Sequence, residues 1–264
     1  MTETLLKVEN LKTWFFVSEG VLRAVDGVSF EVNKGEVLGL VGESGCGKSV
    51  TARSIMRLVP DPPGKIVDGR IQFGDIDLLN LSEEKMRNIR GSRIAMSFQD
   101  PMTYLNPVFR VGDQIAEAII MHQGLKKEEA FEKAVEIMKL VQIPDATRRA
   151  KDYPHQLSGG MRQRILLSIA LSCKPDLLIA DEPTTALDVI VQADILDLLL
   201  DLTKRLDLSL IVFTYNMGVV AQIADRIAIM YAGRIMEFGD VSTVFNSPKN
   251  PYTMGLLASL PRIE

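Results

Sequence analysis

The residues best suited to chemistry form a short glycine-rich run that ends in a lysine and a serine. The run Gly42-Glu43-Ser44-Gly45-Cys46-Gly47-Lys48-Ser49 fits the phosphate-loop pattern G-x-x-x-x-G-K-[ST]. In such a loop, backbone N–H groups at a helix N-terminus and the positive end of the helix dipole bind a polyphosphate. The Lys48 ammonium would add a full charge at the β- and γ-phosphates, and the Ser49 hydroxyl would ligate Mg²⁺. The alternative is a structural turn that matches the pattern by chance.

The segments on either side of this run have the order that a phosphate loop requires. Val37–Val41 is a nearly unbroken apolar run, as expected of a strand buried on both faces of a parallel sheet. Residues 49–58 have apolar positions at mixed helical spacing. Because strand, loop and helix follow one another, the sequence predicts a nucleotide-binding loop.

Two adjacent carboxylates follow a second apolar run, residues 177–180. Asp181 and Glu182 stand at the C-terminal end of this predicted strand, where ligands bind in open α/β sheets. Asp181 would hold Mg²⁺ directly or through water, and Glu182 is placed to polarise a water for in-line attack on the γ-phosphate. An ordinary acidic corner would explain either residue alone, but it explains the pair poorly in a chain with a phosphate loop.

A third candidate is the run Leu157-Ser158-Gly159-Gly160-Met161-Arg162-Gln163-Arg164. Its small residues lead into a predicted helix ending near Cys173, so its N-terminus is a second place where an anion could bind. Without further information it could equally be an ordinary capped helix with Ser158 as the N-cap.

The remaining segments predict the elements that must position these residues. Residues 4–32 contain alternating apolar segments typical of an antiparallel, half-exposed sheet, with the aromatic run Trp14-Phe15-Phe16 before a polar turn. Those aromatics are expected to pack in the core, although one could stack on an adenine ring. Further strands are predicted near residues 70–73, 93–98, 208–213 and 226–231, and helices at residues 111–123, 127–141 and 190–205. The alternation predicts a mostly parallel, doubly wound sheet with a helical insertion at residues 100–156.

Composition excludes several classes of protein. With 264 residues, 47% hydrophobic and 24% charged, the chain is an ordinary globular protein able to bury a large core. A net charge of -4 gives no reason to expect nucleic acid as a partner. We find no apolar run long enough to cross a bilayer and no secretory signal. Two cysteines, Cys46 and Cys173, are too few for a disulfide framework or a metal cluster.

Taken together, the motifs resemble those of the ATP-binding subunits of ABC transporters, and the likeness covers nearly the whole chain. The order is that family's: phosphate loop, Gln99 in SFQDP, the signature at residues 157–160, Asp181-Glu182, and a D-loop around Ala186-Leu187-Asp188. The stretches SFQDPMTYLNPV, GVVAQIADRIAIMYAGRIME and NPYTMGLLASLP look like the oligopeptide/dipeptide importer branch, with nickel importers as the alternative.

The resemblance implies an α/β fold: a phosphate-loop ATPase core with a mostly parallel sheet, an N-terminal antiparallel β subdomain and an inserted helical subdomain. Residues 1–264 would form a single nucleotide-binding domain. Its core would comprise residues 1–99 and 160–240, its helical signature subdomain residues 100–159, and its C-terminal tail residues 241–264.

The resemblance also implies the site: two such subunits would hold ATP and Mg²⁺ between them. Glu182 and Gln99 would act in hydrolysis, with Tyr215 at a third catalytic position. Mg²⁺ would be held by Ser49, Gln99 and Asp181, and Phe15 would stack on adenine, with Trp14 as the alternative. The nucleotide would contact Gly42, Glu43, Ser44, Gly45, Cys46, Gly47, Lys48, Ser49 and Val50. Ser158, Gly159 and Gly160 would contact the nucleotide of the partner subunit.

The partners implied are a second ABC ATPase subunit, identical or not, and two transmembrane permease subunits. A coupling helix of a permease would dock on the loop around residues 101–108. An extracellular substrate-binding protein would take part indirectly, and the chain would be a peripheral protein at the cytoplasmic face of the cell membrane.

The chain departs from the family pattern after the strand at residues 210–213, where the family carries a histidine and this chain has Tyr215. A phenol donates one hydrogen bond, but with a reference pKa near 10 it is neutral at pH 7. We therefore predict that the site binds MgATP well and hydrolyses it slowly. The chain would be the weaker half of a heterodimer, a variant made to trap ATP, or an active enzyme that relies on Glu182 alone.

Other functions explain less of the sequence. A regulatory partner with little hydrolysis is favoured by Tyr215 and disfavoured by Glu182. A non-transport ABC ATPase acting on DNA or ribosomes would need coiled-coil, zinc-ligand or basic insertions, and a phosphate-loop kinase leaves the signature unexplained. This branch often continues into a cysteine-bearing extension that holds an iron–sulfur cluster, but with two cysteines no cluster is expected here.

Overall fold

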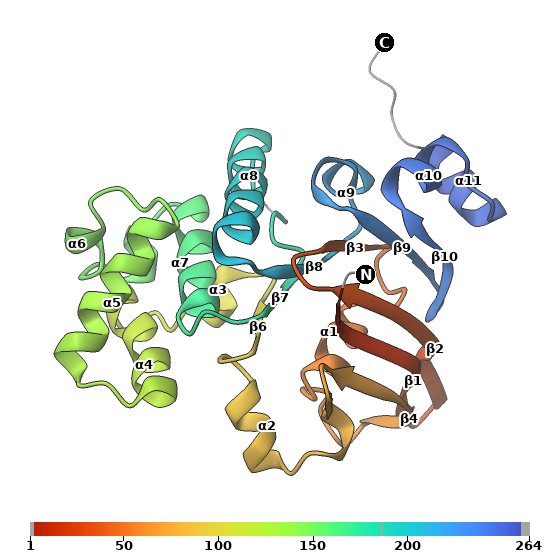
Figure 1. The fold of residues 1–264 in the computed structure, drawn as a ribbon, viewed down its shortest axis with the longest axis horizontal. Helices are drawn as coiled ribbons and strands as arrows, with labels where there is room; N and C mark the ends of the chain where they lie inside the picture. The colour runs from red at the N-terminus through yellow and green to blue at the C-terminus, as the bar shows by residue number, and fades with distance from the viewer. Residues whose placement is uncertain (1–2, 186, 260–264) are drawn as a thin grey trace. The chain divides into compact units, whose positions relative to one another are not determined.

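The computed structural model describes residues 3–185 and 187–259. The chain divides into two compact units, of which the first comprises Met1–Leu81 and Ser209–Glu264 and the second Ser82–Leu208. Figure 1 shows the elements of both units in their order along the chain. The boundaries expected for a helical subdomain at residues 100–159 stay a prediction.

The first unit begins with an antiparallel sheet whose strand order is β2-β1-β4-β5. Its strands are β1 (Thr4–Val17), β2 (Gly20–Asn33), β4 (Gly64–Phe73) and β5 (Ile76–Asp77) (Figure 1, red to orange). Buried Leu6, Val8 and Leu11 alternate with more exposed residues along much of β1, which confirms the predicted half-exposed antiparallel sheet. β1 and β2 are longer than their apolar segments because cross-strand pairing continues to Val17 and Gly20 at the hairpin.

A second group of strands in this unit is mostly parallel. β3 (Val37–Val41) pairs in parallel with β8 (Ser209–Thr214) and with β9 (Arg226–Tyr231), and β10 (Arg234–Asp240) pairs antiparallel to β9. Every residue of β3 and β8 is buried, as their apolar runs predict. The helices of this unit, including several that the sequence did not reveal, are α1 (Lys48–Ile55), the 3-10 turn η1 (Leu78–Asn80), α9 (Met217–Ile223), α10 (Val241–Asn246) and α11 (Pro251–Ala258).

Helix α1 ends three residues earlier than the apolar spacing suggests. Arg57 adopts a left-handed conformation with φ 51°, which stops the helix. The N–H of Leu58 then donates to the carbonyl of Arg53 at 2.7 Å, the reverse hydrogen bond of a Schellman C-cap. Hydrophobic periodicity alone continues through such a cap, so the expected end at residue 58 was wrong.

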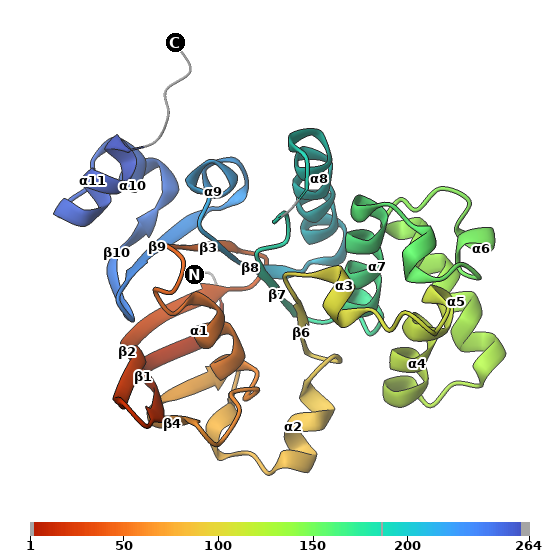
Figure 2. The ribbon, with the colours of Figure 1, turned by 180° about the vertical axis from the view of Figure 1, so that it is seen from behind.

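Within the described residues, the second unit carries the parallel strands β6 and β7 and the helices α2 to α8 (Figure 2). β6 (Ile94–Ser97) pairs with β7 (Leu177–Asp181). The predicted helices at 111–123 and 127–141 are confirmed as α4 (Val111–Gln123) and α5 (Lys127–Leu140). The other helices are α2 (Glu83–Ile89), α3 (Pro101–Tyr104), α6 (Ala146–Arg149), the 3-10 turn η2 (Pro154–Gln156), α7 (Gly159–Leu171) and α8 (Val189–Leu206). Within the part of the chain that the structure describes, no helix has both the length and the apolar character of a membrane span.

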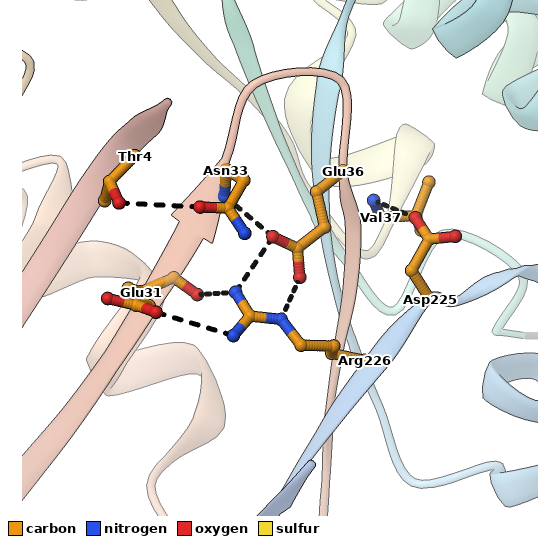
Figure 3. A network of polar contacts seen from close by, with 7 residues as sticks. All are labelled: Thr4, Glu31, Asn33, Glu36, Val37, Asp225 and Arg226. Atoms are coloured by element: carbon orange, nitrogen blue, oxygen red, sulfur yellow. Dashed lines mark hydrogen bonds and ion pairs between the residues drawn. The ribbon is translucent and has the colours of Figure 1, made fainter. Parts of the chain in front are cut away.

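A polar network joins the start of β9 to the turn before β3 (Figure 3). The Arg226 guanidinium donates to both carboxylate oxygens of Glu36, at 2.5 and 2.9 Å, and to the Glu31 carbonyl oxygen at 3.1 Å. The Glu36 side chain is only 8% exposed, and it also accepts the Asn33 N–H at 2.7 Å. These contacts raise the pKa of Arg226, chiefly through its hydrogen bond to Glu36.

We expect Arg226→Ala to lower the free energy of unfolding by about 3 kcal/mol, because it leaves the buried Glu36 carboxylate without its cationic partner. Urea unfolding at pH 7 measures the loss. A matched control is Arg205→Ala, which breaks an exposed pair with Asp201 at 3.0 Å and should cost less than about 0.5 kcal/mol. A loss at Arg226 no larger than that of the control would contradict the assignment of this network as a stabilising contact.

Candidate functional site

The glycine-rich loop joins β3 to α1, as predicted. Helix α1 begins at Lys48, and its N-cap Gly47 has φ 112° and no side chain to cap the helix. Gly47 can adopt this left-handed conformation because it lacks a Cβ atom. Since no N-cap side chain occupies the first turn, the loop has the form of an anion-binding helix terminus.

The turn between β9 and β10 supports this loop from within the first unit. The N–H of Gly233 donates to the Cys46 carbonyl oxygen at 2.9 Å. A Cβ atom at Gly42 would lie 2.2 Å from the Met230 carbonyl oxygen, so only glycine permits this approach. The loop conformation therefore depends on β9, which lies far along the chain.

Lys48 provides the positive charge of the loop. Its side chain is buried, with 4% of the residue exposed, and its Nζ donates to the carbonyl oxygens of Gly42 at 2.7 Å and Glu43 at 2.9 Å. A buried ammonium beside an uncapped helix terminus is suited to binding a polyphosphate. Ser49 and Val50 follow as the second and third residues of α1, so the Ser49 hydroxyl belongs to the first turn.

Phe15 and Trp14, the two residues predicted to stack on adenine, lie on opposite faces of β1. The hydroxyls of Thr13 and of Ser54 in α1 lie 2.8 Å apart, so the Thr13 face of β1 is turned toward α1. Phe15 shares that face, because side chains alternate along a strand. Trp14 points the other way, and the Arg23 guanidinium carbon lies over its ring, 4.8 Å from the ring centroid. This placement favours Phe15 over Trp14, and stacking on adenine stays a prediction.

In the second unit, the parallel pairing of β6 and β7 brings two predicted residues together. Ser97 pairs with Ala180, so Gln99 and Glu182 follow at the same edge. The Gln99 Nε2 donates to the Glu182 Oε2 at 2.8 Å. Asp181 is the last residue of β7 and is buried. Glu182 has φ 49°, a left-handed conformation that costs a non-glycine residue about 1 kcal/mol or more.

Ser158 and the two glycines after it begin helix α7. Ser158 is the N-cap, and its hydroxyl oxygen accepts the N–H of Met161 at 3.3 Å, so the capped-helix interpretation holds for this residue. A Cβ atom at Gly160 would lie 2.6 Å from a methyl carbon of Val191, so close packing against α8 requires this glycine. A contact of Ser158 and Gly160 with the nucleotide of a partner subunit is compatible with these roles and stays a prediction.

Tyr215 lies at the edge of the parallel strands beside the phosphate loop. Thr214 pairs in parallel with Val41. The next residues, Tyr215 and Gly42, therefore both follow the carboxyl ends of neighbouring strands. Tyr215 is an exposed residue, with 55% of its surface accessible. Asn216 after it caps α9 by accepting the N–H of Gly218 at 2.9 Å. Tyr215, which is predicted to replace a histidine, therefore follows the strand beside the phosphate loop and is exposed.

Comparison with known proteins decides the family. The family described as "ABC transporter" matches residues 25–185. The chain belongs to this family. As an ABC chain, it has the α/β fold that its motifs predicted, with an antiparallel sheet beside mostly parallel strands.

Several curated and solved proteins resemble this ABC chain over most of its length. The dipeptide transport ATP-binding protein DppD of Bacillus subtilis (strain 168) is 53% identical, covering 99% of this chain and 78% of that protein. The oligopeptide transport ATP-binding protein OppD of the same organism is 52% identical, covering 98% and 73%. The ATP-binding cassette MJ0796, in a dimeric post-hydrolysis state bound to ADP and Pi, has a TM-score of 0.80 at 26% identity, covering 90% of this chain and 99% of that one. These matches identify the chain as an ABC-type ATPase.

The predicted site residues of this ABC ATPase are divided between the two units. The phosphate loop, Phe15 and Tyr215 belong to the first unit, and the residues near β6, β7 and α7 belong to the second. Ala186 of the predicted D-loop lies outside the described residues. The oxygen donors proposed for a metal are a serine hydroxyl, a glutamine amide and a carboxylate, which suit the hard cation Mg²⁺.

One contact of Glu182 was not predicted. The hydroxyl of Thr185 donates to the Glu182 Oε2 at 2.8 Å, so this oxygen receives two donors. The run DEPTT places a hydroxyl residue three positions after the glutamate and two after Pro183, and this is the signal that could have revealed the contact.

The two thiols of the ABC chain differ in burial. Burial raises the pKa of the Cys46 thiol, so it stays protonated at neutral pH and is a poor nucleophile. Cys173 is partly exposed. We expect iodoacetamide at pH 7.5 to alkylate Cys173 at least about tenfold faster than Cys46, with labelling of Cys46 increasing as the pH rises. Peptide mass spectrometry over time measures both rates, and Cys173→Ser is the control. Equal rates would contradict the burial of Cys46.

Proposed function

We propose that this chain is the ATP-hydrolysing subunit of an ABC importer of peptides. The proposal rests on one observation: a phosphate loop with an uncapped helix and buried Lys48, in a chain 53% identical to a dipeptide transport ATP-binding protein. Dipeptides and oligopeptides are the substrates that the relatives' names favour. A nickel importer is the alternative within the same branch.

The site residues have distinct roles in this proposal. Lys48 and the first turn of α1 bind the β- and γ-phosphates, and Phe15 stacks on the adenine. Ser49, Gln99 and Asp181 would hold Mg²⁺, which would neutralise charge on the phosphates. Glu182 orients the attacking water and accepts its proton. Contacts from Ser158, Gly159 and Gly160 to the nucleotide of a second ATPase subunit complete the site.

A groove in the second unit is our candidate docking surface for a permease. It is lined by side chains of α3, α4 and the loop between them, including exposed Tyr104, Phe109 and Met121 and the carboxylates of Asp113 and Glu117, and by Lys127 of α5 and Ile169 of α7. A largely apolar face that carries both acidic and basic groups would suit a short cytoplasmic helix with apolar side chains at its centre and charged side chains at its rim. The chain would thereby be held at the cytoplasmic face of the membrane, with a substrate-binding protein outside.

A chain of contacts leads from this groove toward the carboxylate of Glu182. The ring of Tyr104 stacks on that of Phe98, with centroids 4.1 Å apart and planes 11° apart. The next residue, Gln99, donates to Glu182. In this proposal a permease helix that docks in the groove acts on the hydrolytic residues through the Tyr104–Phe98 stack and the adjacent Gln99.

Transport in vesicles tests the proposal. The chain is reconstituted with its two permease subunits, any second ATPase subunit and the binding protein, and uptake of a labelled dipeptide, a labelled hexapeptide and Ni²⁺ is measured with MgATP. We expect uptake of at least one peptide, abolished by Lys48→Ala, and none of Ni²⁺. Uptake of Ni²⁺ alone would favour the nickel importer, and ATP-independent uptake would overturn the proposal.

Tyr215 favours a second candidate, a nucleotide-binding regulatory subunit that hydrolyses little ATP. Its exposed phenol follows the strand beside the phosphate loop, at the position where we predicted that a tyrosine replaces a histidine. In that case an unlike partner subunit would supply most of the hydrolysis, and Lys48→Ala would weaken nucleotide binding without removing that hydrolysis.

A further inference from the structure

The turn that follows Glu182 holds its side chain in one orientation. The N–H of Thr185 donates to the Glu182 carbonyl oxygen at 3.2 Å, and the hydroxyl of Thr185 donates to the Glu182 Oε2 at 2.8 Å. Pro183 restricts the backbone within this turn, as proline does early in β-turns. Thr185 is therefore bonded twice to the same glutamate, once through the backbone and once through the side chain.

The hydrogen bonds divide the two oxygens of the carboxylate between different tasks. Oε2 accepts both the Gln99 amide and the Thr185 hydroxyl, each at 2.8 Å. Among the described residues, Oε1 accepts no hydrogen bond, so it is the oxygen left for a water. Glu182 has a left-handed backbone, a strained conformation that persists only where the surrounding contacts hold it.

We propose that Thr185 is a positioning residue for hydrolysis: its hydroxyl holds Oε2 of Glu182 so that Oε1 faces the attacking water. The inference rests on the proposed function, in which Glu182 accepts the proton of that water. A general base is effective only when it lies within hydrogen-bonding reach of the proton that it removes. Thr185 itself would touch neither nucleotide nor metal, so its loss should affect the rate of hydrolysis and leave binding unchanged.

Three substitutions separate the hydroxyl from the shape of the side chain. Thr185→Val keeps the branched shape without the hydroxyl, Thr185→Ser keeps the hydroxyl, and Thr185→Ala removes both. In single-turnover hydrolysis with MgATP, we expect the valine and alanine variants to be roughly 10- to 100-fold slower, the effect of losing a hydrogen bond to a charged group. The serine variant should stay within about threefold of the unchanged chain, and the Kd for MgATP should change less than about threefold in all three.

A double substitution tests whether Thr185 acts through Glu182. If it does, Glu182→Gln with Thr185→Val should be no slower than Glu182→Gln alone, because residues that act as a unit are not additive. Additive losses, or a valine variant as fast as the serine variant, would overturn the inference. Thermal unfolding identifies any variant that is misfolded; if the valine variant unfolds early, the alanine and serine variants carry the comparison.

The same experiment distinguishes failure of this inference from failure of the proposed function. If the unchanged chain, with its partner subunits, does not hydrolyse ATP, the proposed function fails. If the chain hydrolyses ATP and Glu182→Gln stops it while Thr185→Val does not, only the role of Thr185 is overturned.

Discussion

Replacing Glu182 with glutamine should reduce single-turnover ATP hydrolysis by about 10²- to 10⁴-fold, the contribution of a positioned general base. Glutamine keeps the size of the side chain and its ability to accept a hydrogen bond from Thr185, but it cannot accept a proton from water. Binding of MgATP should change less than about fivefold, because in the proposed function the phosphates are bound by the loop around Lys48, which belongs to the other unit.

Rapid-quench measurement of product formation at saturating MgATP, together with equilibrium binding, measures both quantities. Glu84→Gln is the matched control, because it makes the same chemical change at an exposed carboxylate in α2, and its rate should equal that of the unchanged chain. Hydrolysis that survives Glu182→Gln at more than about a tenth of the original rate would remove Glu182 as the base and leave a substrate-assisted mechanism.

Replacing Tyr215 with histidine should increase hydrolysis by about 10²-fold or more, since a positioned proton-handling group contributes 10²- to 10⁴-fold. The imidazole is suited to this task because its two nitrogens can donate and accept at neutral pH. Tyr215 is 55% exposed at the edge beside the phosphate loop, so the change should not disturb the core. We therefore expect MgATP affinity to change only a few-fold.

The measurement is single-turnover hydrolysis beside equilibrium MgATP binding, with and without a candidate partner subunit. Tyr215→Phe is the control, because it removes the phenol hydroxyl without introducing an imidazole, and it should not accelerate hydrolysis. If only the histidine variant hydrolyses ATP rapidly, the unchanged site binds MgATP but is weakened in hydrolysis. Equal turnover in the chain and its histidine variant would show that the tyrosine is tolerated and that the chain is an ordinary transport ATPase.

Local patterns were sufficient for much of the fold. The helices α4 and α5 and the strands β3, β7 and β8 follow their apolar periodicity closely, because burial on one side or both sides determines which residues each element carries. The same reasoning missed α9, β10, α10 and α11. These elements are short or carry mixed apolar and polar residues, and their stability comes from packing against the rest of the first unit rather than from periodicity.

The amino-acid pattern was enough to identify the chemical groups and their order: a phosphate loop, a glutamine, a Ser-Gly-Gly turn and a pair of carboxylates. It did not show which groups contact one another, because those contacts depend on the folding of distant segments. Gln99 and Glu182 are 83 positions apart, and Arg226 and Glu36 are 190 apart, so strand pairing and the turns between strands bring them together. The run DEPTT indicates that Thr185 lies near Glu182, but the direction of its hydroxyl depends on backbone angles that spacing does not specify.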